Sequence, residues 1–231
     1  MKTIGIIGGM SWESSALYYT LLNREVQKRL GGLHSASTLM YSFDFDEVET
    51  LQSSGREQAS TAMIAQAGAR LAEGGADFIV IACNTAHRAA DAVAKASGLP
   101  LLHIADPVGE AVRADGLSRV GLIGSAHTMR DPAILKGRLA KRYDLDVVVP
   151  GDADAAEVDR VILEELVLGK FLESSRARYR QIMARLVEKG VEGIILGCTE
   201  IPLLVKPGDA AVPLYDTSTL HAMAAVDMAL A

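Results

Sequence analysis

The stretch that decides the fold covers residues 75–87 and reads Gly-Ala-Asp-Phe-Ile-Val-Ile-Ala-Cys-Asn-Thr-Ala-His. A second stretch, residues 190–202, reads Gly-Val-Glu-Gly-Ile-Ile-Leu-Gly-Cys-Thr-Glu-Ile-Pro. Each has the pattern of a short buried strand that runs into a turn, with a cysteine and two polar residues at its carboxyl end. Cys83 and Cys198 are the only two cysteines in the chain. A hypothesis about function has to explain their matched placement.

Two landmarks recur at almost the same offset, which indicates an internal duplication. Cys198 lies 115 residues after Cys83, and Gly121 in the segment Arg-Val-Gly-Leu-Ile-Gly lies 116 residues after Gly5 in Thr-Ile-Gly-Ile-Ile-Gly. Strand-like and helix-like segments alternate along the chain, which is typical of an α/β fold with parallel sheets. We therefore predict two pseudo-symmetric lobes, each a parallel sheet of about four strands flanked by helices.

Lobe one is predicted to consist of residues 1–98 and 210–231, and lobe two of residues 99–209. Besides the two cysteine strands, strands are expected at residues 2–8, 37–43, 99–104, 119–124, 145–149 and 212–215. Helices are expected at residues 12–30, with Ser11 as N-cap, and at 56–73, 85–97, 132–143, 155–168, 172–189 and 218–231. Residues 44–55 read as an acidic loop with a helical turn. Ligand sites in such sheets lie at the carboxyl ends of strands, so an active site is expected in the cleft between the lobes.

Composition narrows the class of function. The net charge of the 231-residue chain is −6, and no dense run of lysine or arginine favours nucleic-acid binding. No run approaches the roughly 18 apolar residues of a membrane span. Two cysteines without an export signal favour a reducing cytoplasm. A homodimer is the expected assembly because dimers are the commonest closed oligomers.

The two thiols suggest acid–base chemistry. A thiol between a strand and a helix feels the positive end of the helix dipole, which favours thiolate. Backbone N–H groups in the polar pairs after Cys83 and Cys198 can bind an oxygen anion. If the two sites face each other, a thiolate can remove a proton from one face of a carbon while a thiol delivers one to the other. The sulfurs would then lie about 6–7 Å apart, too far for a disulfide.

Three plainer interpretations compete with this one. A buried cysteine is a common small core residue. The two cysteines could also form a structural disulfide, or bind a metal ion, although two cysteines without a nearby histidine pair lack the spacing of metal ligands. The duplication weighs against all three interpretations. Unrelated core positions would not be expected to lie at the offset that the rest of the duplication shows, each followed by two polar residues. We predict no metal.

Three motifs carry a resemblance to a known family: Gly-Ile-Ile-Gly-Gly-Met-Ser-Trp-Glu-Ser at 5–14, Cys-Asn-Thr-Ala-His at 83–87 and Gly-Cys-Thr-Glu-Ile-Pro at 197–202. With them the whole chain resembles the aspartate/glutamate racemase superfamily. The resemblance implies a cofactor-independent amino-acid racemase with Cys83 and Cys198 as its paired acid and base. It also places five residues around an amino-acid substrate: Met10, Asn84, Thr85, Thr128 and Glu200.

The residues themselves add two candidates to that set. The turn that follows the first strand should bring Ser11 to the site together with Met10, and Thr199 follows Cys198 as a source of N–H donors. Thr199-Glu200, in place of Thr-His, resembles the aspartate-racemase branch. Glu200 is expected either to relay a proton to Cys198 or to cap the next helix. His87 is expected either to tune Cys83 or to lie partly exposed on its helix.

The sequence departs from the aspartate-racemase pattern where that branch binds the side-chain carboxylate. Residues 42–49 are acidic and lack an arginine, and residues 165–169 are largely apolar where a lysine is expected, although Lys170 is close. The chain resembles a subgroup regarded as broad-specificity amino-acid racemases. Residues 44–49 are our candidate selector of the side chain. An unchanged substrate profile in Asp44→Asn or Asp46→Asn variants would contradict that hypothesis.

Other functions remain open at this point. A cis–trans isomerase of an unsaturated diacid, or an arylmalonate-type decarboxylase, could use the same fold, and in the isomerase one cysteine would act as a nucleophile. A non-enzymatic small-molecule binding module is a third alternative. Matched thiols are hard to explain in a binder, and a pyridoxal absorbance would count against the racemase.

Overall fold

A computed structural model describes residues 1–231 and divides them into two compact units. Unit 1 comprises Met1–Ile104 and His221–Ala231, and unit 2 comprises Ala105–Leu220. The sequence-based boundaries lay after residues 98 and 209. The structural ones fall later because Leu101 still pairs with Ile79 in unit 1 and residues 214–216 form a strand of unit 2.

Unit 1 contains a three-stranded parallel sheet with the order β2-β1-β3. Its strands are β1 (Ile4–Gly8), β2 (Thr38–Ser42) and β3 (Phe78–Ile81). Its helices are α1 (Trp12–Leu30), α2 (Phe45–Ser53), α3 (Glu57–Glu73), α4 (Ala90–Ser97) and most of α11 (Thr217–Leu230), which enters unit 1 at His221. A 3-10 turn, η1 (Thr85–Ala89), precedes α4.

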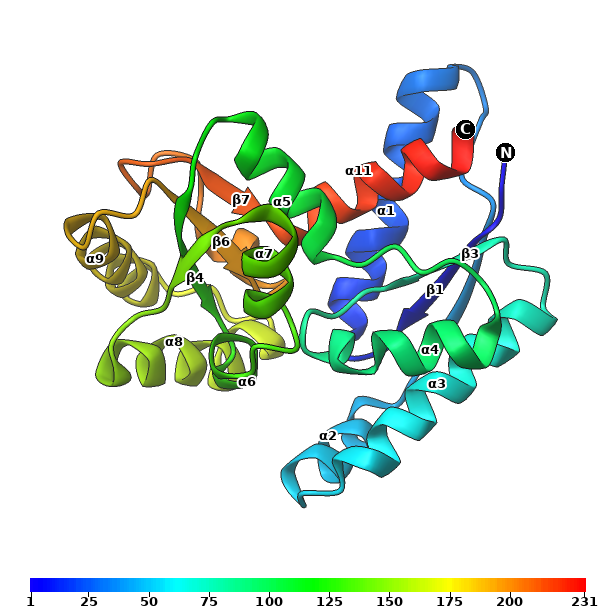
Figure 1. Ribbon diagram of the computed structural model, residues 1–231, viewed down its shortest axis with the longest axis horizontal. Helices are drawn as coiled ribbons and strands as arrows, with labels where there is room; N and C mark the ends of the chain where they lie inside the picture. Colours follow the sequence, from blue (N-terminus) through cyan, green and yellow to red (C-terminus); the bar gives the residue numbers. More distant parts are fainter. The chain divides into compact units, whose positions relative to one another are not determined.

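Helices cover both faces of this sheet (Figure 1). Successive side chains of a strand point to opposite faces. Ile4 and Ile6 pack in a cluster with α1 and α11, whereas Ile7 packs with α3 and α4. Both faces of β1 and β3 are therefore buried, which explains why these two strands read as continuous apolar runs, whereas β2 is partly exposed.

Unit 2 contains a four-stranded parallel sheet with the order β5-β4-β6-β7. Its strands are β4 (Arg119–Gly124), β5 (Asp146–Val148), β6 (Gly193–Gly197) and β7 (Leu214–Asp216). Its helical segments are α5 (Ala105–Ala114), α6 (Ala126–Arg130), α7 (Lys136–Tyr143), α8 (Asp152–Glu164), η2 (Leu166–Leu168), α9 (Glu173–Glu188) and α10 (Ile201–Leu204).

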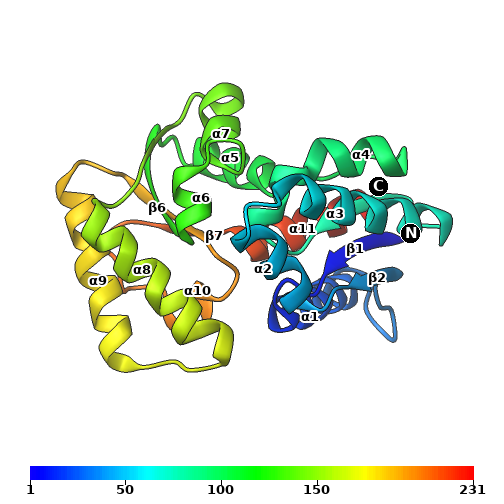
Figure 2. The same cartoon turned by 90° about the horizontal axis from the view of Figure 1, so that it is seen from below.

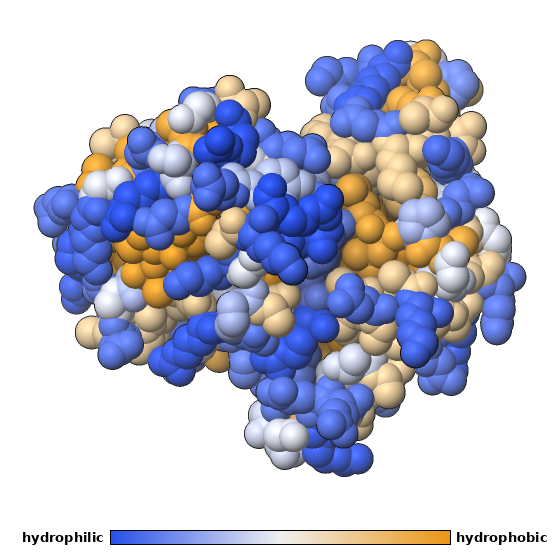
Figure 3. Space-filling view, in the orientation of Figure 1, coloured by the Kyte–Doolittle hydropathy of each residue, from blue (hydrophilic) through white to orange (hydrophobic).

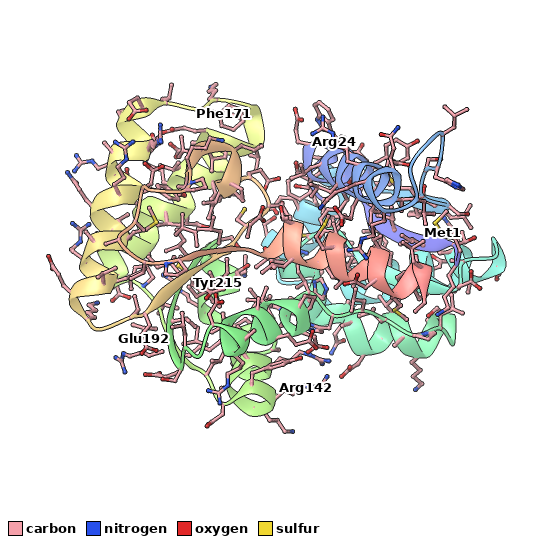
Figure 4. The ribbon with its side chains drawn as sticks, turned by 90° about the horizontal axis from the view of Figure 1, so that it is seen from above. Met1, Arg24, Arg142, Phe171, Glu192 and Tyr215 are labelled. Atoms are coloured by element: carbon pink, nitrogen blue, oxygen red, sulfur yellow. The ribbon has the colours of Figure 1, made fainter.

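The helices of unit 2 also form two layers. Figure 2 shows α8 and α9 on one side of the sheet and α5 and α7 on the other. The strand residues Ile123, Ile194 and Leu196 share a buried cluster with α8 and α9. On the other side Tyr215 of β7, labelled in Figure 4, donates a 2.6 Å hydrogen bond from its hydroxyl to the carboxylate of Asp115, which directly follows α5.

The strand registers confirm the predicted pseudo-symmetry. Ile4 pairs with Phe78 in unit 1, and the residues at the duplicated positions, Val120 and Gly193, pair in unit 2. The α/β fold with two parallel sheets is therefore the one that the sequence predicted. The sheets differ in size because the fourth strand expected at residues 99–104 is reduced to a single bridge at Leu101.

Several helical segments differ from the prediction, and α2 and α5 show the reasons. The acidic segment expected to be a loop with one helical turn contains the longer helix α2, because the carboxylate of Asp44 accepts a hydrogen bond from the backbone N–H of Asp46 and Val48 is fully buried. Helix α5 was not predicted. Its central Gly109 hid the pattern, and this glycine is needed because a Cβ atom there would lie 2.4 Å from the ring of Tyr143.

None of the helices of the protein combines the length and the apolar character that crossing a bilayer requires. Across residues 1–231, no three histidine, cysteine, aspartate or glutamate residues are grouped so that they could hold a metal ion.

Candidate active site

In unit 1, two turns leave the same edge of the sheet. β1 and β3 are parallel neighbours with Ile7 opposite Ile81, and the N–H of Ala82 donates a 2.9 Å hydrogen bond to the carbonyl of Ile7. Residues 8–11 follow β1 and residues 83–85 follow β3. The predicted site residues of this half of the chain are thus brought together at the carboxyl ends of adjacent strands.

The turn after β1 has a backbone that only glycine fits. Gly9 has a φ of +84°, and a Cβ atom on it would lie 2.2 Å from the backbone nitrogen of Phe43. The hydroxyl of Ser15 accepts a 2.8 Å hydrogen bond from the N–H of Gly9 and donates one of 3.2 Å to the carbonyl of Ser11. Ser15 was not singled out in the sequence, although serines at 11 and 15 are one helical turn apart.

Ser11 is held in a strained conformation. Its φ of +72° is unusual for a residue with a side chain. The residue is 7% exposed, and its hydroxyl has no hydrogen-bond partner in the protein. Ser11 occupies the N-cap position of α1, but its side chain caps no backbone N–H, so the predicted capping role is wrong. Strain and an unpaired buried hydroxyl favour a role toward a ligand.

Met10 lies next to Ser11 but turns its side chain inward. It is buried in the hydrophobic cluster that includes Ile7 and Val48. The polar group that this turn offers is therefore the hydroxyl of Ser11.

The turn after β3 carries a partly buried thiol, that of Cys83, which is in no disulfide. Asn84 is buried and Thr85 is half-buried at the start of η1. His87 is 2% exposed, so the expected alternative of a partly exposed histidine is wrong. Its Nδ1 lies 2.9 Å from the carbonyl oxygen of Cys83. Burial holds the pKa of His87 well below its usual range, and the nearby rings of His103 and His221 add to this effect.

In unit 2 the second thiol has a carboxylate neighbour. Cys198 is partly buried and in no disulfide, and its Sγ donates a 3.0 Å hydrogen bond to Oε2 of Glu200. Oγ1 of Thr199 donates to the same oxygen at 2.8 Å. Glu200 is 3% exposed, and its side chain caps no N–H of α10. The alternative of a helix cap is therefore wrong, and the carboxylate instead bonds to the thiol.

Thr128 lies beside the end of the second cysteine strand. β4 and β6 pair through Gly124 and Gly197, and a Cβ atom on Gly197 would lie 3.2 Å from the methyl group of Thr128. Thr128 is fully buried, and its hydroxyl lies 3.1 Å from that of Ser125. Unit 2 thus brings Thr128 close to the strand end that carries Cys198, Thr199 and Glu200.

The segments at which the sequence departed from the aspartate-racemase pattern form ordinary structure. Asp44 caps α2, and the tip formed by α2 is mostly hydrophilic in the space-filling view (Figure 3). Glu165 is buried, accepts a 2.5 Å hydrogen bond from Ser175 and pairs with Arg160. Lys170 is exposed. Neither segment contributes a buried cation.

Together, the two units present matched but unequal chemistry. Each holds a thiol outside any disulfide at the carboxyl end of its cysteine strand, β3 or β6, beside buried polar side chains. The thiol of Cys198 has a carboxylate as its hydrogen-bond acceptor, whereas Cys83 is followed by the amide side chain of Asn84. A thiol can act as a general acid and its thiolate as a general base, so each unit offers one group for proton transfer.

Comparison with known proteins gives one consistent family. A protein from Yersinia pestis assigned as an Asp/Glu racemase is 46% identical, with a TM-score of 0.94 and complete coverage of both chains. An aspartate racemase homologue from Pyrococcus horikoshii OT3 is 32% identical, with a TM-score of 0.82 and complete coverage of both chains.

A curated relative, the glutamate racemase of Pseudomonas aeruginosa, is 32% identical over 139 residues, which make up 59% of this chain and 50% of that protein. The match thus spans half the length of that relative. The model of the family described as Asp/Glu/Hydantoin racemase matches residues 7–225. The chain therefore belongs to the Asp/Glu/hydantoin racemase family.

Proposed function

We propose that the protein is a cofactor-independent amino-acid racemase that uses Cys83 and Cys198 as its two bases. The observation that carries this proposal is the duplicated placement of two thiols, neither of them in a disulfide, at equivalent ends of equivalent strands. The family membership supports racemase chemistry as the reaction class.

In the proposed reaction, the thiolate of one cysteine removes the α-proton from one face of the substrate, leaving a carbanion stabilised as an enolate of the carboxylate. The thiol of the other cysteine delivers its proton to the opposite face. The product is the other enantiomer, and the two sulfurs have exchanged protonation states. Ser11, Asn84, Thr85 and Thr199 are the proposed donors to the substrate carboxylate.

Glu200 makes the two sulfurs unequal in the resting protein. Its carboxylate accepts the proton of Cys198 in a hydrogen bond, which favours the thiol form there. We propose that Cys83 is the thiolate of the resting enzyme. Aspartate and glutamate are the leading substrates, since two similar proteins of known structure are named for one or both of them. Other amino acids are candidates because residues 44–49 supply carboxylates and no arginine.

The test is deuterium incorporation at the α-carbon in heavy water, without added cofactor, using both enantiomers of aspartate, glutamate and a panel of neutral and basic amino acids. We expect exchange with loss of optical purity. Cys83→Ser and Cys198→Ser should each lower net inversion by about 10³-fold. No exchange with any amino acid in the unmodified protein would contradict the proposal, and unsaturated diacids and arylmalonates would be tested next.

A further inference from the structure

In unit 1, two histidine side chains replace a pair of backbone hydrogen bonds that a longer parallel strand would make. In unit 2, β6 and β7 pair at Ile194 with Leu214 and again at Leu196 with Asp216. In unit 1 the corresponding segment pairs once, where the N–H of Leu102 donates a 3.0 Å hydrogen bond to the carbonyl of Ile79. The next rung of a parallel ladder would use the carbonyl of Leu102 and the N–H of Ile104.

Both of these backbone groups are bonded to imidazoles instead. The N–H of Ile104 donates to Nε2 of His87 at 3.1 Å, and the carbonyl of Leu102 lies 2.9 Å from Nε2 of His221. The chain leaves unit 1 after Ile104 and returns to it at His221. The two rings therefore hold the chain where it leaves and re-enters unit 1.

The backbone partners fix the proton on each ring. A backbone N–H can only donate, so Nε2 of His87 is unprotonated and its proton is on Nδ1, which donates to the carbonyl of Cys83. A carbonyl can only accept, so Nε2 of His221 carries the proton and its Nδ1 accepts from the hydroxyl of Tyr18 at 2.9 Å.

The surroundings keep His87 neutral. A second proton on Nε2 would face the N–H of Ile104, which would place two donors against each other. The ring of His103 lies 4.6 Å from that of His87, and the ring of His221, on α11, lies 5.7 Å away. Tyr18 on α1 reaches this group through His221, and the neighbouring Arg88 pairs with Glu57 on α3. His87 therefore supplies no positive charge to the thiol of Cys83.

We propose that His87 is a positioning residue for Cys83. Its neutral ring ties the carbonyl of Cys83 to the N–H of Ile104 and thereby fixes the peptide that joins Cys83 to Asn84. This inference rests on the proposed function, in which Cys83 is a base. The duplicated position in unit 2 is Pro202, whose side chain can make no hydrogen bonds of this kind. The arrangement is therefore found beside Cys83 and not beside Cys198.

The test compares three variants. His87→Leu removes the donor and the acceptor, His87→Gln keeps one of each on a planar group, and His34→Gln alters an exposed histidine of the same unit as a matched control. We expect His87→Leu to lower kcat/KM for racemisation by about 10²-fold. His87→Gln should recover most of the loss, and His34→Gln should behave as the unmodified protein.

The two enantiomers have equal free energies, so kcat/KM must fall by the same factor in both directions of the reaction. Isotope effects can show which of the two proton-transfer steps has become slower. In His87→Leu the α-deuterium isotope effect should rise for the enantiomer from which Cys83 removes the proton, and the solvent isotope effect should rise for the other. If both isotope effects rise equally for the two enantiomers, the substitution has caused a general loss of structure, and the proposal is overturned.

Two further measurements do not depend on racemase activity. Nitrogen-15 NMR of labelled histidine should show His87 with its proton on Nδ1 and no titration between about pH 5 and 8. Site-resolved alkylation should show a changed rate at Cys83 in His87→Leu and an unchanged rate at Cys198. A proton on Nε2, or equal changes at both thiols, would overturn the inference. An inactive natural protein that passes both measurements would count against the proposed function alone.

Discussion

At the scale of single residues, the two thiols differ most through Glu200. Its carboxylate both accepts the proton of Cys198 and repels a negative charge on that sulfur. Glu200→Gln removes the charge with little change of shape, so the thiolate fraction of Cys198 should rise. We expect alkylation of Cys198 at neutral pH to become faster by about tenfold, an effect of about one pKa unit, with Cys83 unchanged.

Iodoacetamide labelling followed by peptide mass spectrometry reads both sulfurs in one sample. Glu188→Gln is the matched control, because Glu188 is exposed at the end of α9 in the same unit. If Cys198 in Glu200→Gln reacts no faster than in this control, the carboxylate does not govern the thiol. The proposed thiolate at Cys83 would then lose its basis.

His87 should also make stability depend on pH. Its pKa is well below the usual value in the folded protein because the ring is buried, whereas the unfolded chain binds a proton near pH 6.5. The unfolded state therefore binds more protons below that pH. This contribution is fully present above about pH 6.5 and should decline by at most about 1.4 kcal/mol for each pH unit below it.

Urea unfolding at several pH values measures this slope. His87→Gln should have a shallower slope than the natural protein, while His34→Gln should keep the natural one because its ring is exposed in the folded state. Equal slopes in all three proteins would mean that His87 is not held neutral by the fold.

At the scale of elements, the strands predicted most accurately are those whose sequence pattern occurs in both halves of the chain. β1, β3, β4 and β6 and their turns were found because each strand has a partner at an offset of 115 or 116 residues. Both cysteines were found for the same reason. The full length of α2 was missed, and only a helical turn was expected there, because one buried residue, Val48, is too weak a periodic signal.

The remaining differences come from contacts that one stretch of sequence does not contain. The apolar residues 99–104 read as a strand, yet the last hydrogen bonds of that strand go to His87 and His221, which are far away in sequence. Ser15 could not be placed without knowing that it bonds to the N–H of Gly9. Such side-chain bonds to backbone groups compete with regular pairing and leave no periodic pattern.

The turn between β1 and α1 gives a test at this scale. Gly9→Ala would place a Cβ atom 2.2 Å from the nitrogen of Phe43 in a strained conformation, and we expect a loss of about 3 kcal/mol or more in the free energy of unfolding. Gly75→Ala is the matched control. Gly75 also has a positive φ, of +93°, but has open space around it, so only the backbone strain of about 1–2 kcal/mol should be lost.

Chemical denaturation of both variants measures the difference. Racemisation should fall with Gly9→Ala, because the turn also holds Ser11, and should persist with Gly75→Ala. Similar losses of stability in the two variants would show that the close approach of Phe43 to Gly9 is easily relaxed.

At the scale of the whole molecule, unit 1 is built from both ends of the chain. The N–H of Lys2 donates a 2.8 Å hydrogen bond to the carbonyl of Ala229, and Arg29 pairs with Asp227. The C-terminal helix α11 adds four residues to the cluster around α1, β1 and β3: Ala222, Ala225, Val226 and Ala229. Unit 1 therefore cannot complete its core until the last residues of the chain are present.

Deleting residues 221–231 should accordingly unfold unit 1. The deletion removes the apolar surface that α11 buries, and the free energy of that burial is a large part of a total stability of about 5–15 kcal/mol. Hydrogen exchange read by mass spectrometry should show lost protection in β1 and β3. Protection in β4 and β6 should remain, since their cluster draws only on residues 105–220. Deleting Ala231 alone, which lies beyond α11 and is exposed, is the control. Full protection of β1 and β3 in the longer deletion would show that α11 is not needed to hold Cys83 in place.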